Sequence, residues 1–305
     1  MVYYEIRIVN GKKQNYLVYN SRKNNKWIKK SKFIGLGDLN KKEISLLKKK
    51  FEKDIILNKN YIYLELEDIK EIENLKYNYN EKIKKLEKEE YEKFQKSFFT
   101  ELTYNSNAIE GNSLSLEETS LVVNDKIVPE GKTLREIYEA KGHMEALNFI
   151  KTYEGDLNEE FILKIHFIIL KNISERFAGK YRETNVRIFG SDVKLLNYFL
   201  VPKLMKNLIY WYKKNKKNYH QFEMAILISM KLVTIHPFVD GNGRVSRLVM
   251  NFLLNKKDYP WVNIYNKQRQ KYLTAVRKAN DEKYDLIFPF LISTLKENLK
   301  DFNLL

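Results

Sequence analysis

The sequence contains no cysteine, which excludes disulfides and thiolate metal sites. It has only four histidines, and they are widely separated, so a structural zinc site is not expected either. No apolar run approaches the ~20 residues that a membrane-spanning helix needs, and the N-terminal residues lack the apolar core of a secretory signal. We therefore expect a cytoplasmic protein without a membrane partner.

The composition is that of a folded protein. Of the 305 residues, 44% are hydrophobic and 13% aromatic, which is enough to build a core and argues against disorder. The net charge is +16, from 55 Lys and Arg against 39 Asp and Glu. Such an excess attracts polyanions, so a nucleic-acid partner is one interpretation. The lysines are dispersed along the chain, which favours the alternative that they solvate the surface.

Residues 1–38 differ from the rest and predict a small, basic, antiparallel β element. Residues 3–9 alternate between apolar and polar, Asn10-Gly11 is a strong hairpin turn, and residues 16–19 and 26–34 are typical of further strands. Basic residues are interleaved with tyrosine and tryptophan, a mixture suited to nucleic acid. A small sheet packed against a helical body would have the same composition.

The remaining chain predicts helices. From residue 39 to 97 apolar residues recur at steps of three and four, and Asn40 can cap the first helix. Because no strict heptad holds, we expect these helices to pack on the main body rather than to form a coiled coil. Further helices are expected at 116–123, 134–153 and 157–172. The predicted fold is mainly α, with regions 1–38, 39–97 and 98–305.

The most informative stretch is I-H-P-F-V-D-G-N-G-R-V-S-R at residues 235–247. Pro237 disfavours helical geometry at His236, so a helix should end there. Gly241 and Gly243 permit positive φ in the turns that follow. Apolar residues then recur at helical spacing, so a second helix should begin near Asn242.

The side chains of this stretch suit a phosphorylated ligand. The N-terminus of a helix attracts anions, and Arg244 and Arg247, three apart, can share one helix face. Asp240 is a hard oxygen ligand suited to Mg²⁺ on phosphates. His236 has a reference pKa that lets it take a proton near neutral pH. These parts are typical of nucleotidyl or phosphoryl transfer.

Residues 236–247 resemble the full signature of the Fic family, whose members transfer AMP from ATP to a protein hydroxyl. The resemblance implies a helical core with a β-hairpin flap, and Mg²⁺ with ATP as the substrate. It implies that His236 takes the proton from the target hydroxyl and that Asp240 holds Mg²⁺. Asn242 and the Gly241 and Gly243 amides would hold the α-phosphate. Arg244 would hold the β-phosphate, and Arg247 the γ-phosphate. Gly243 favours AMP transfer, because kinase-like relatives depart from these glycines.

A second stretch, S-N-A-I-E-G-N at residues 106–112, places Ser106 and Glu110 on one face of a helix. Taken alone, it could be a helix end with a surface acid. Beside the signature, it resembles the inhibitory motif of the Fic class that carries this helix on the N-terminal side. The resemblance implies that Glu110 pairs with Arg247 in a bidentate contact and blocks the γ-phosphate.

Other assignments depend on the resemblance alone. It implies a target-docking flap at Val186, Arg187, Ile188, Phe189 and Gly190, and adenine or ribose contacts at Tyr272 and Asn280. Two departures are visible: the Pro-Pro pair that often follows the flap is missing, and Ser229 stands where relatives often have histidine. His143 and His166 are expected to be satisfied imidazoles, and His220 a cap or surface residue.

The sequence thus predicts a nucleotidyltransferase that moves AMP to a Ser, Thr or Tyr hydroxyl of a target protein or of itself, autoinhibited by Glu110. One alternative is that Glu110 orients a water and the reaction is hydrolysis of an AMP–protein bond. Another is a nucleic-acid-binding regulator with a weakly active core. The target, the choice of ATP over other nucleotides and the formation of a homodimer stay open.

Overall fold

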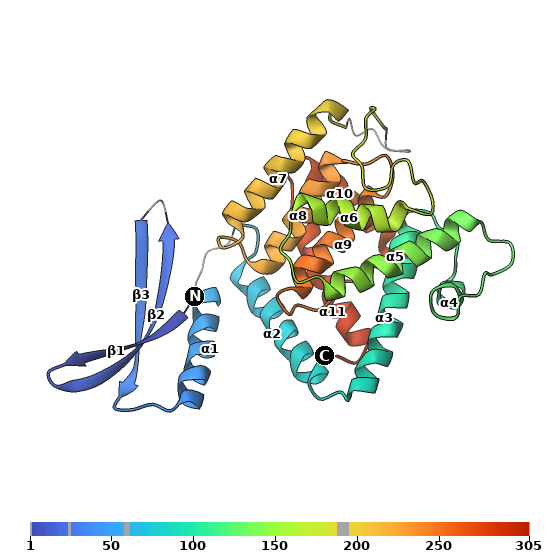
Figure 1. Cartoon of the computed structure of the whole chain (residues 1–305). Coiled ribbons are helices and arrows are strands. Elements are labelled where there is room, and N and C mark those ends of the chain that lie inside the picture. The colour runs from blue at the N-terminus through green and yellow to red at the C-terminus, as the bar shows by residue number, and fades with distance from the viewer. Residues whose placement is uncertain (1, 24–25, 58–61, 188–194, 305) are drawn as a thin grey trace. The chain divides into compact units, whose positions relative to one another are not determined.

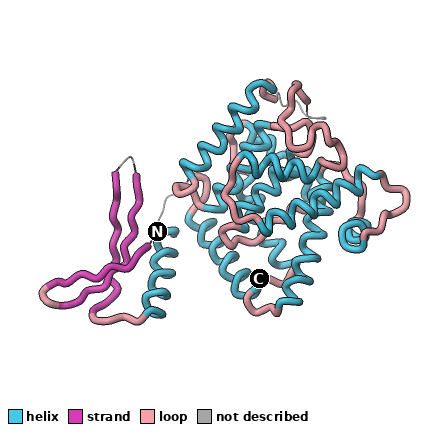
Figure 2. The backbone as a smooth tube through the Cα atoms, in the orientation of Figure 1, coloured by secondary structure: helices cyan, strands magenta, loops and turns pink. Residues whose placement is uncertain are grey.

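The computed structural model describes residues 2–23, 26–57, 62–187 and 195–304. The chain forms two compact units, residues 1–60 and 61–305 (Figure 1). The functional division at residues 38 and 97 expected from the sequence stays a prediction. Helices make up most of the large unit, and among the described residues strands are confined to the small one (Figure 2). The predicted fold class, mainly α with a small N-terminal antiparallel sheet, is confirmed.

The small unit is a three-stranded antiparallel sheet with one helix. Strands β1 (Val2–Val9), β2 (Lys12–Lys23) and β3 (Lys26–Leu36) lie in the order β1-β2-β3. Asn10 and Gly11 both have positive φ, 49° and 71°, as the two central residues of a type I′ turn require. The predicted hairpin is therefore confirmed.

Helix α1 (Lys41–Leu57) covers one face of this sheet. Phe51 of α1 packs with Val2 and Leu17 in a small buried core. Asn40 caps the helix as expected: its Oδ1 accepts the Glu43 N–H at 2.9 Å, and the Glu43 carboxylate accepts the Asn40 N–H at 2.9 Å. Helix α1 therefore supplies the apolar surface against which the sheet packs.

The large unit is helical throughout the residues that the structure describes. Its α-helices are α2 (Leu66–Ile83), α3 (Lys88–Ile109), α4 (Leu116–Ser120), α5 (Leu134–Thr152), α6 (Glu159–Leu170), α7 (Val201–Asn215), α8 (Gln221–Ile235), α9 (Asn242–Asn255), α10 (Arg269–Asn280) and α11 (Ile287–Asp301). Single turns of π- or 3-10 helix lie at Leu121–Asp125, Tyr198–Leu200 and Asn266–Gln268. Among the described residues, no helix is long and apolar enough to cross a membrane.

Two details of the helices were not expected from the sequence. Helices α2 and α3 are separate, and Glu87 caps the N-terminus of α3 through a reciprocal contact with Glu90. The helix expected at 116–123 ends at Ser120, and a π-helical turn follows it.

Helices α8 and α9 form a hairpin at the centre of the large unit (Figure 1). Helix α9 packs against α8, α5, α6 and α3, while α8 also packs against α7 and α10. Phe252 of α9 lies 4.2 Å, centroid to centroid, from Phe161 of α6. Each such buried side chain contributes about 1.5–3 kcal/mol by leaving water. The loop that joins α8 to α9 is therefore held between two firmly packed helices.

Candidate active site: the loop between α8 and α9

The loop begins with a reversal of backbone direction at His236. This residue has φ 52° and ψ 59°, a left-handed conformation that is uncommon outside glycine. Helix α8 ends there, as Pro237 predicts. The buried side chain of Arg182 holds the reversal in place: its Nε donates to the His236 carbonyl at 2.8 Å, and its backbone N–H donates to the Pro237 carbonyl at 2.9 Å.

Asn242 closes the loop from the other end. Its Nδ2 donates to the Phe238 carbonyl and its Oδ1 accepts the Phe238 N–H, both at 2.9 Å. Helix α9 starts at this residue, as predicted. Gly241, with φ 80°, is the N-cap and offers no side chain, so the N–H groups of the first turn are left without a side-chain cap. Such an end suits an anion.

Gly243 does not have the positive φ that the sequence suggested. It lies in the first turn of α9, and its importance is spatial. A Cβ placed on Gly243 would fall 2.2 Å from Oε1 of Glu110 and 3.1 Å from Nη1 of Arg247. The missing side chain therefore leaves the space that the Glu110 carboxylate fills.

His236 is arranged to accept a proton. Its Nδ1 lies 3.3 Å from the Val233 carbonyl, which can only accept a hydrogen bond, so we assign the ring proton to Nδ1 and the lone pair to Nε2. Burial lowers the pKa of His236, and the opposing effects of the Val233 carbonyl and of the Glu110 and Asp240 charges do not reverse the shift. The imidazole is neutral at pH 7.

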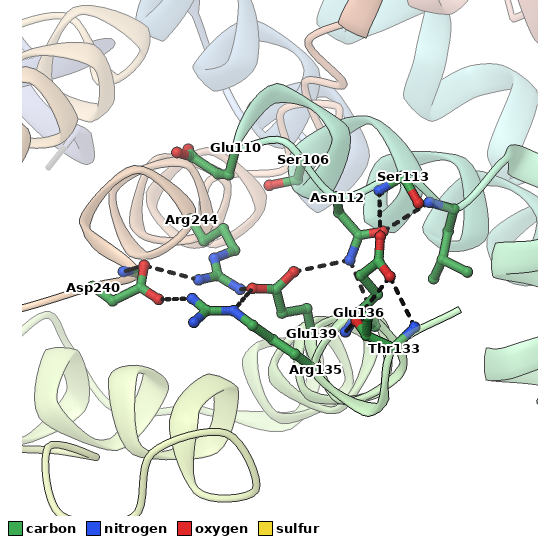
Figure 3. A network of polar contacts seen from close by, with 12 residues as sticks. Ser106, Glu110, Asn112, Ser113, Thr133, Arg135, Glu136, Glu139, Asp240 and Arg244 are labelled. Atoms are coloured by element: carbon green, nitrogen blue, oxygen red, sulfur yellow. Dashed lines mark hydrogen bonds and ion pairs between the residues drawn. The ribbon is translucent and has the colours of Figure 1, made fainter. Parts of the chain in front are cut away.

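Asp240 is surrounded by donors. Its Oδ1 accepts the Gly241 N–H at 2.5 Å and Nη2 of Arg244 at 3.2 Å, and its Oδ2 accepts Nη2 of Arg135 at 2.6 Å (Figure 3). Burial works to raise the pKa of Asp240, but the Arg244 charge, the Gly241 amide and Arg135 outweigh it and hold the pKa below its usual value. The carboxylate is ionised at neutral pH.

The carboxylate of Asp240 fits a magnesium ion that arrives with phosphates. Among the described residues, no three His, Asp or Glu side chains cluster as a metal site of their own. Mg²⁺ commonly binds through one or two carboxylates together with water and substrate phosphates. A single ionised carboxylate beside a helix N-terminus matches that requirement.

The two arginines of the signature have different partners. Arg244, 2% exposed, faces Asp240 and also lies 3.4 Å from Oε1 of Glu139 on α5. That Glu139 oxygen forms an ion pair with Nη1 of Arg244, whereas Nε has no acceptor within the described part of the chain. An unpaired buried donor is costly unless a ligand satisfies it, so the Nε of Arg244 is suited to bind an anion.

Arg247 is held by helix α3. Its Nη2 donates to Oε1 of Glu110 at 2.7 Å and to the Ser106 carbonyl at 2.8 Å, while its Nε donates to Oγ of Ser106 at 3.1 Å. The expected pairing with Glu110 is present, but the expected bidentate geometry is wrong. Glu110 uses one oxygen, and Ser106 accepts from Nε and shares Nη2 with Glu110.

One buried histidine, His166, supports the site more directly than the sequence suggested. Gly179 N–H donates to Nδ1 of His166 at 3.0 Å, so Nε2 carries the proton and donates to the Asp240 carbonyl at 3.1 Å. The His166 ring also stacks on Phe238, with the two centroids 3.7 Å apart. Burial lowers the pKa of His166 to about 4. His166 is thus a satisfied imidazole, as expected, and also a support for the loop.

His143 is fully buried, and its Nδ1 lies 3.0 Å from Oγ1 of Thr103. Burial lowers the pKa of His143 to about 3, with Arg247 and Arg244 adding to the effect. Among the described residues its Nε2 has no hydrogen-bond partner, so it is a core imidazole that is only half satisfied.

The other sequence-predicted residues lie near the hairpin. Ser229 donates from Oγ to the Ser246 carbonyl at 2.9 Å, which links α8 to α9 where relatives often place a histidine. His220 is the N-cap residue of α8, and its Nε2 lies 3.0 Å from Oε1 of Glu73, so the surface alternative is wrong. The structure therefore gives both residues supporting positions in the core.

The predicted purine contacts both lie on α10. Tyr272 is buried, with its ring centroid 5.9 Å from the Arg247 guanidinium carbon, and Oδ1 of Asn280 accepts the Thr234 hydroxyl at 2.7 Å. In the predicted flap, Val186 and Arg187 have no strand assignment, while Ile188, Phe189 and Gly190 lie outside the described residues. The roles of all these residues stay predictions.

Comparison with known proteins agrees with this geometry. Residues 156–254, which span α6 to α9, match the model of the Fic/DOC family. A solved Fic domain containing signaling protein from Bacteroides thetaiotaomicron superposes with a TM-score of 0.68 at 26% identity, covering 75% of this chain and 94% of that one. Residues 156–254 form a Fic domain. Its loop between α8 and α9 is the Fic signature expected from the sequence.

Several proteins named "Protein adenylyltransferase Fic" are similar to this chain. The relative from Nematostella vectensis is 36% identical over 182 residues, which cover 58% of this chain and 42% of that protein. The relative from Drosophila grimshawi is 32% identical over 197 residues, covering 61% and 39% respectively. The chain thus spans about two fifths of the length of the curated relatives it matches. Fic-1 from C. elegans shares the fold, with a TM-score of 0.70 at 23% identity, 87% of this chain and 78% of that one being covered.

Proposed function

We propose that this protein transfers AMP from Mg·ATP to a hydroxyl group of a protein, and that Glu110 inhibits the reaction. The observation that carries the proposal is the α8–α9 loop. It presents a neutral imidazole at His236, an ionised carboxylate at Asp240, the unpaired Nε of Arg244, and a first turn of α9 that has no side-chain cap. The similar proteins that bear the name adenylyltransferase support the same choice.

The chemistry follows from these positions. The hydroxyl oxygen of a Ser, Thr or Tyr side chain attacks the α-phosphorus, and the bond from that phosphorus to the bridging oxygen of pyrophosphate breaks. The hydroxyl proton passes to Nε2 of His236. The α9 amides and Arg244 hold the phosphate oxygens as negative charge develops. Mg²⁺, held at Asp240, would neutralise part of that charge.

Glu110 blocks this reaction by occupying Arg247. A triphosphate that needs Arg247 for its last phosphate meets a guanidinium already bound to Glu110 and Ser106. Hydrogen bonds to charged groups contribute about 1.5–3 kcal/mol each, so the nucleotide must displace a substantial interaction. ATP then binds without its phosphates aligned for attack.

Labelled nucleotides test the reaction type. With ATP labelled at the α-phosphate, the Glu110→Gly variant should label itself or a protein in a cell lysate, and ATP labelled at the γ-phosphate should give no label. Label from the γ-phosphate would instead indicate phosphate transfer. Repeating the experiment with the other three nucleoside triphosphates identifies the preferred base.

A second candidate reaction is hydrolysis of an AMP–protein bond. The charge of Glu110 acts on His236, so this carboxylate lies close enough to the base to affect its protonation. It could orient a water there in place of the target hydroxyl. Incubating the parental protein with an AMP-modified target distinguishes the two reactions. A hydrolase releases AMP when no pyrophosphate is added, whereas a transferase can remove AMP only by the reverse reaction with pyrophosphate.

A nucleic-acid partner is favoured by one observation on the small unit. Residues 1–60 contain 16 Lys and Arg against 5 Asp and Glu, a net charge of +11, whereas residues 61–305 carry only +5. The net positive charge is thus concentrated in residues 1–60, whereas the lysines were expected to be dispersed along the chain. Phosphate backbones bind such surfaces in a salt-dependent way. A gel shift that weakens with salt, and is lost when residues 1–60 are deleted, would support this partner.

A further inference from the structure

Arg135 contacts the proposed metal ligand from a distant part of the chain. It lies in the first turn of α5, which Thr133 caps by accepting the Glu136 N–H on its Oγ1 at 3.3 Å. The Arg135 guanidinium bridges two acids: Nε donates to Oε1 of Glu139 at 3.2 Å, and Nη2 donates to Oδ2 of Asp240 at 2.6 Å (Figure 3). The capped turn fixes the backbone from which Arg135 reaches the loop.

Both oxygens of the Asp240 carboxylate therefore accept hydrogen bonds. Oδ1 accepts from the Gly241 amide and Arg244, and Oδ2 accepts from Arg135 alone among the described residues. A divalent cation binds a carboxylate oxygen through a free lone pair. Oδ1 is bound to the loop's own backbone, so the oxygen that a cation can reach with least rearrangement is Oδ2. A cation that binds there meets the positive charge of Arg135 and competes with its hydrogen bond.

The position of Arg135 is set from a second direction by Glu139. This acid accepts Arg135 on Oε1, lies 3.4 Å from Nη1 of Arg244, and accepts Nδ2 of Asn112 on Oε2 at 2.9 Å. Asn112 follows Glu110 by two residues, so the segment that ends the inhibitory helix also fixes Glu139. Figure 3 shows these side chains as one connected set. Arg135 is thus held by defined contacts with Glu139 and Asp240 and is not an unpaired surface cation.

We propose that Arg135 is a built-in substitute for the divalent cation: it neutralises and orients Asp240 when no metal is bound, and it competes with the metal for Oδ2. The proposal rests on the metal-binding role of Asp240 in the proposed function. It makes Arg135 a positioning residue that raises the cation concentration needed to load the site. The Arg135 side chain is 61% exposed and that of Asp240 38%, so the guanidinium can move into solvent at small cost.

The expected effect is modest and has a defined sign. An exposed ion pair contributes little to stability, and removing its cation should tighten metal binding by roughly two- to fivefold. Arg135→Gln removes the charge and keeps a side chain of similar length. Arg135→Lys keeps the charge and should stay close to the parental affinity. Arg176→Gln, at an exposed arginine outside the site, is a matched control for the loss of one positive charge.

Mn²⁺ provides a measurement that does not depend on activity. The full chain is labelled with ¹⁵N-glycine, and the paramagnetic broadening of the Gly241 amide is followed as Mn²⁺ is added. We expect tighter binding in Arg135→Gln than in the parent, Arg135→Lys and Arg176→Gln, and no site-specific broadening in Asp240→Asn. Equal affinity in Arg135→Gln and the parent, with Asp240→Asn still deficient, would overturn the role of Arg135 and leave the metal site standing. Broadening that survives Asp240→Asn would overturn the metal ligand and the inference together.

Discussion

The carboxylate of Glu110 fills the place of the side chain that Gly243 lacks. An added Cβ at residue 243 would lie 2.2 Å from Oε1 of Glu110, far inside van der Waals contact. The same oxygen accepts Nη2 of Arg247 at 2.7 Å. The contact between Glu110 and Arg247, which we propose to be inhibitory, therefore also depends on Gly243, because that residue leaves the space open.

Gly243→Ala should relieve the inhibition. The new methyl group must displace the Glu110 carboxylate from Arg247, and losing a charged hydrogen bond of about 1.5–3 kcal/mol corresponds to roughly a ten- to hundredfold gain in AMP labelling. Labelling is measured with α-labelled ATP on the purified variant. In the Glu110→Gly background the same substitution should give no further gain in labelling, because the Glu110 carboxylate that the methyl group would displace is already absent. A gain of equal size in both backgrounds would show that the methyl group acts by another route.

Ser106→Ala should relieve the inhibition only partly. The variant loses the Oγ that accepts Nε of Arg247, but it keeps the Ser106 carbonyl and Glu110 as partners. Because the hydroxyl is neutral, its bond to the guanidinium lies at the low end of the range for charged groups, about 1.5 kcal/mol, and predicts a gain in labelling of roughly tenfold, below that of Glu110→Gly. The two single variants are compared at the same ATP concentration. If Ser106→Ala equals or exceeds Glu110→Gly, the hydroxyl and not the carboxylate is the main restraint.

The labelling rate of the Glu110→Gly variant should fall at acid pH with a midpoint below 6.5. Burial lowers the pKa of His236, so the base stays neutral until the pH drops below its usual titration range. Removing Glu110 also removes a charge that favours the protonated ring, which moves the midpoint further down. A midpoint above 6.5 would contradict the neutral, buried base.

The unfolding free energy should decrease as the pH falls from 6.5 to 5. Burial lowers the pKa of His143 to about 3 and that of His166 to about 4, whereas both titrate near 6.5 in the unfolded chain. The unfolded state therefore binds protons that the folded state excludes, and each histidine contributes a loss of up to about 1.4 kcal/mol per pH unit.

Urea unfolding at a series of pH values measures this dependence. His166→Gln should reduce the slope by the share of one histidine, while the loss of its buried hydrogen bonds lowers stability by about 1–3 kcal/mol at pH 7. An unchanged slope would indicate that His166 is protonated in the folded protein.

The sequence predicted those structural features that depend only on neighbouring residues in the chain. Pro237 ends α8, Asn10-Gly11 forms the turn, and Asn40 caps α1, because each of these acts on backbone within a few positions. The signature loop and its pairing with Glu110 were predicted from the resemblance, which already contains the long-range information. Gly243 was misread as a source of positive φ, since the sequence cannot show that another side chain needs its space.

The supporting contacts could not be predicted from the sequence. Arg182 reaches a carbonyl 54 residues away, and Arg135 reaches a carboxylate 105 residues away. Each is an ordinary basic residue in its local context, and only tertiary packing brings it to the loop. His166 gave a weak signal as a histidine within an apolar helix, but its link to Asp240 depends on how α6 packs against α9. These residues stabilise the loop, and the signature residues within it carry the proposed chemistry.

The most direct test of the account compares three proteins with α-labelled ATP: the parent, Glu110→Gly, and Glu110→Gly combined with His236→Ala. We predict little label on the parent, a gain of at least about tenfold in Glu110→Gly from the release of Arg247, and loss of that gain in the double variant. A folded Glu110→Gly protein that labels no better than the parent would contradict the inhibition. A double variant that keeps the label would contradict the assignment of His236 as the base.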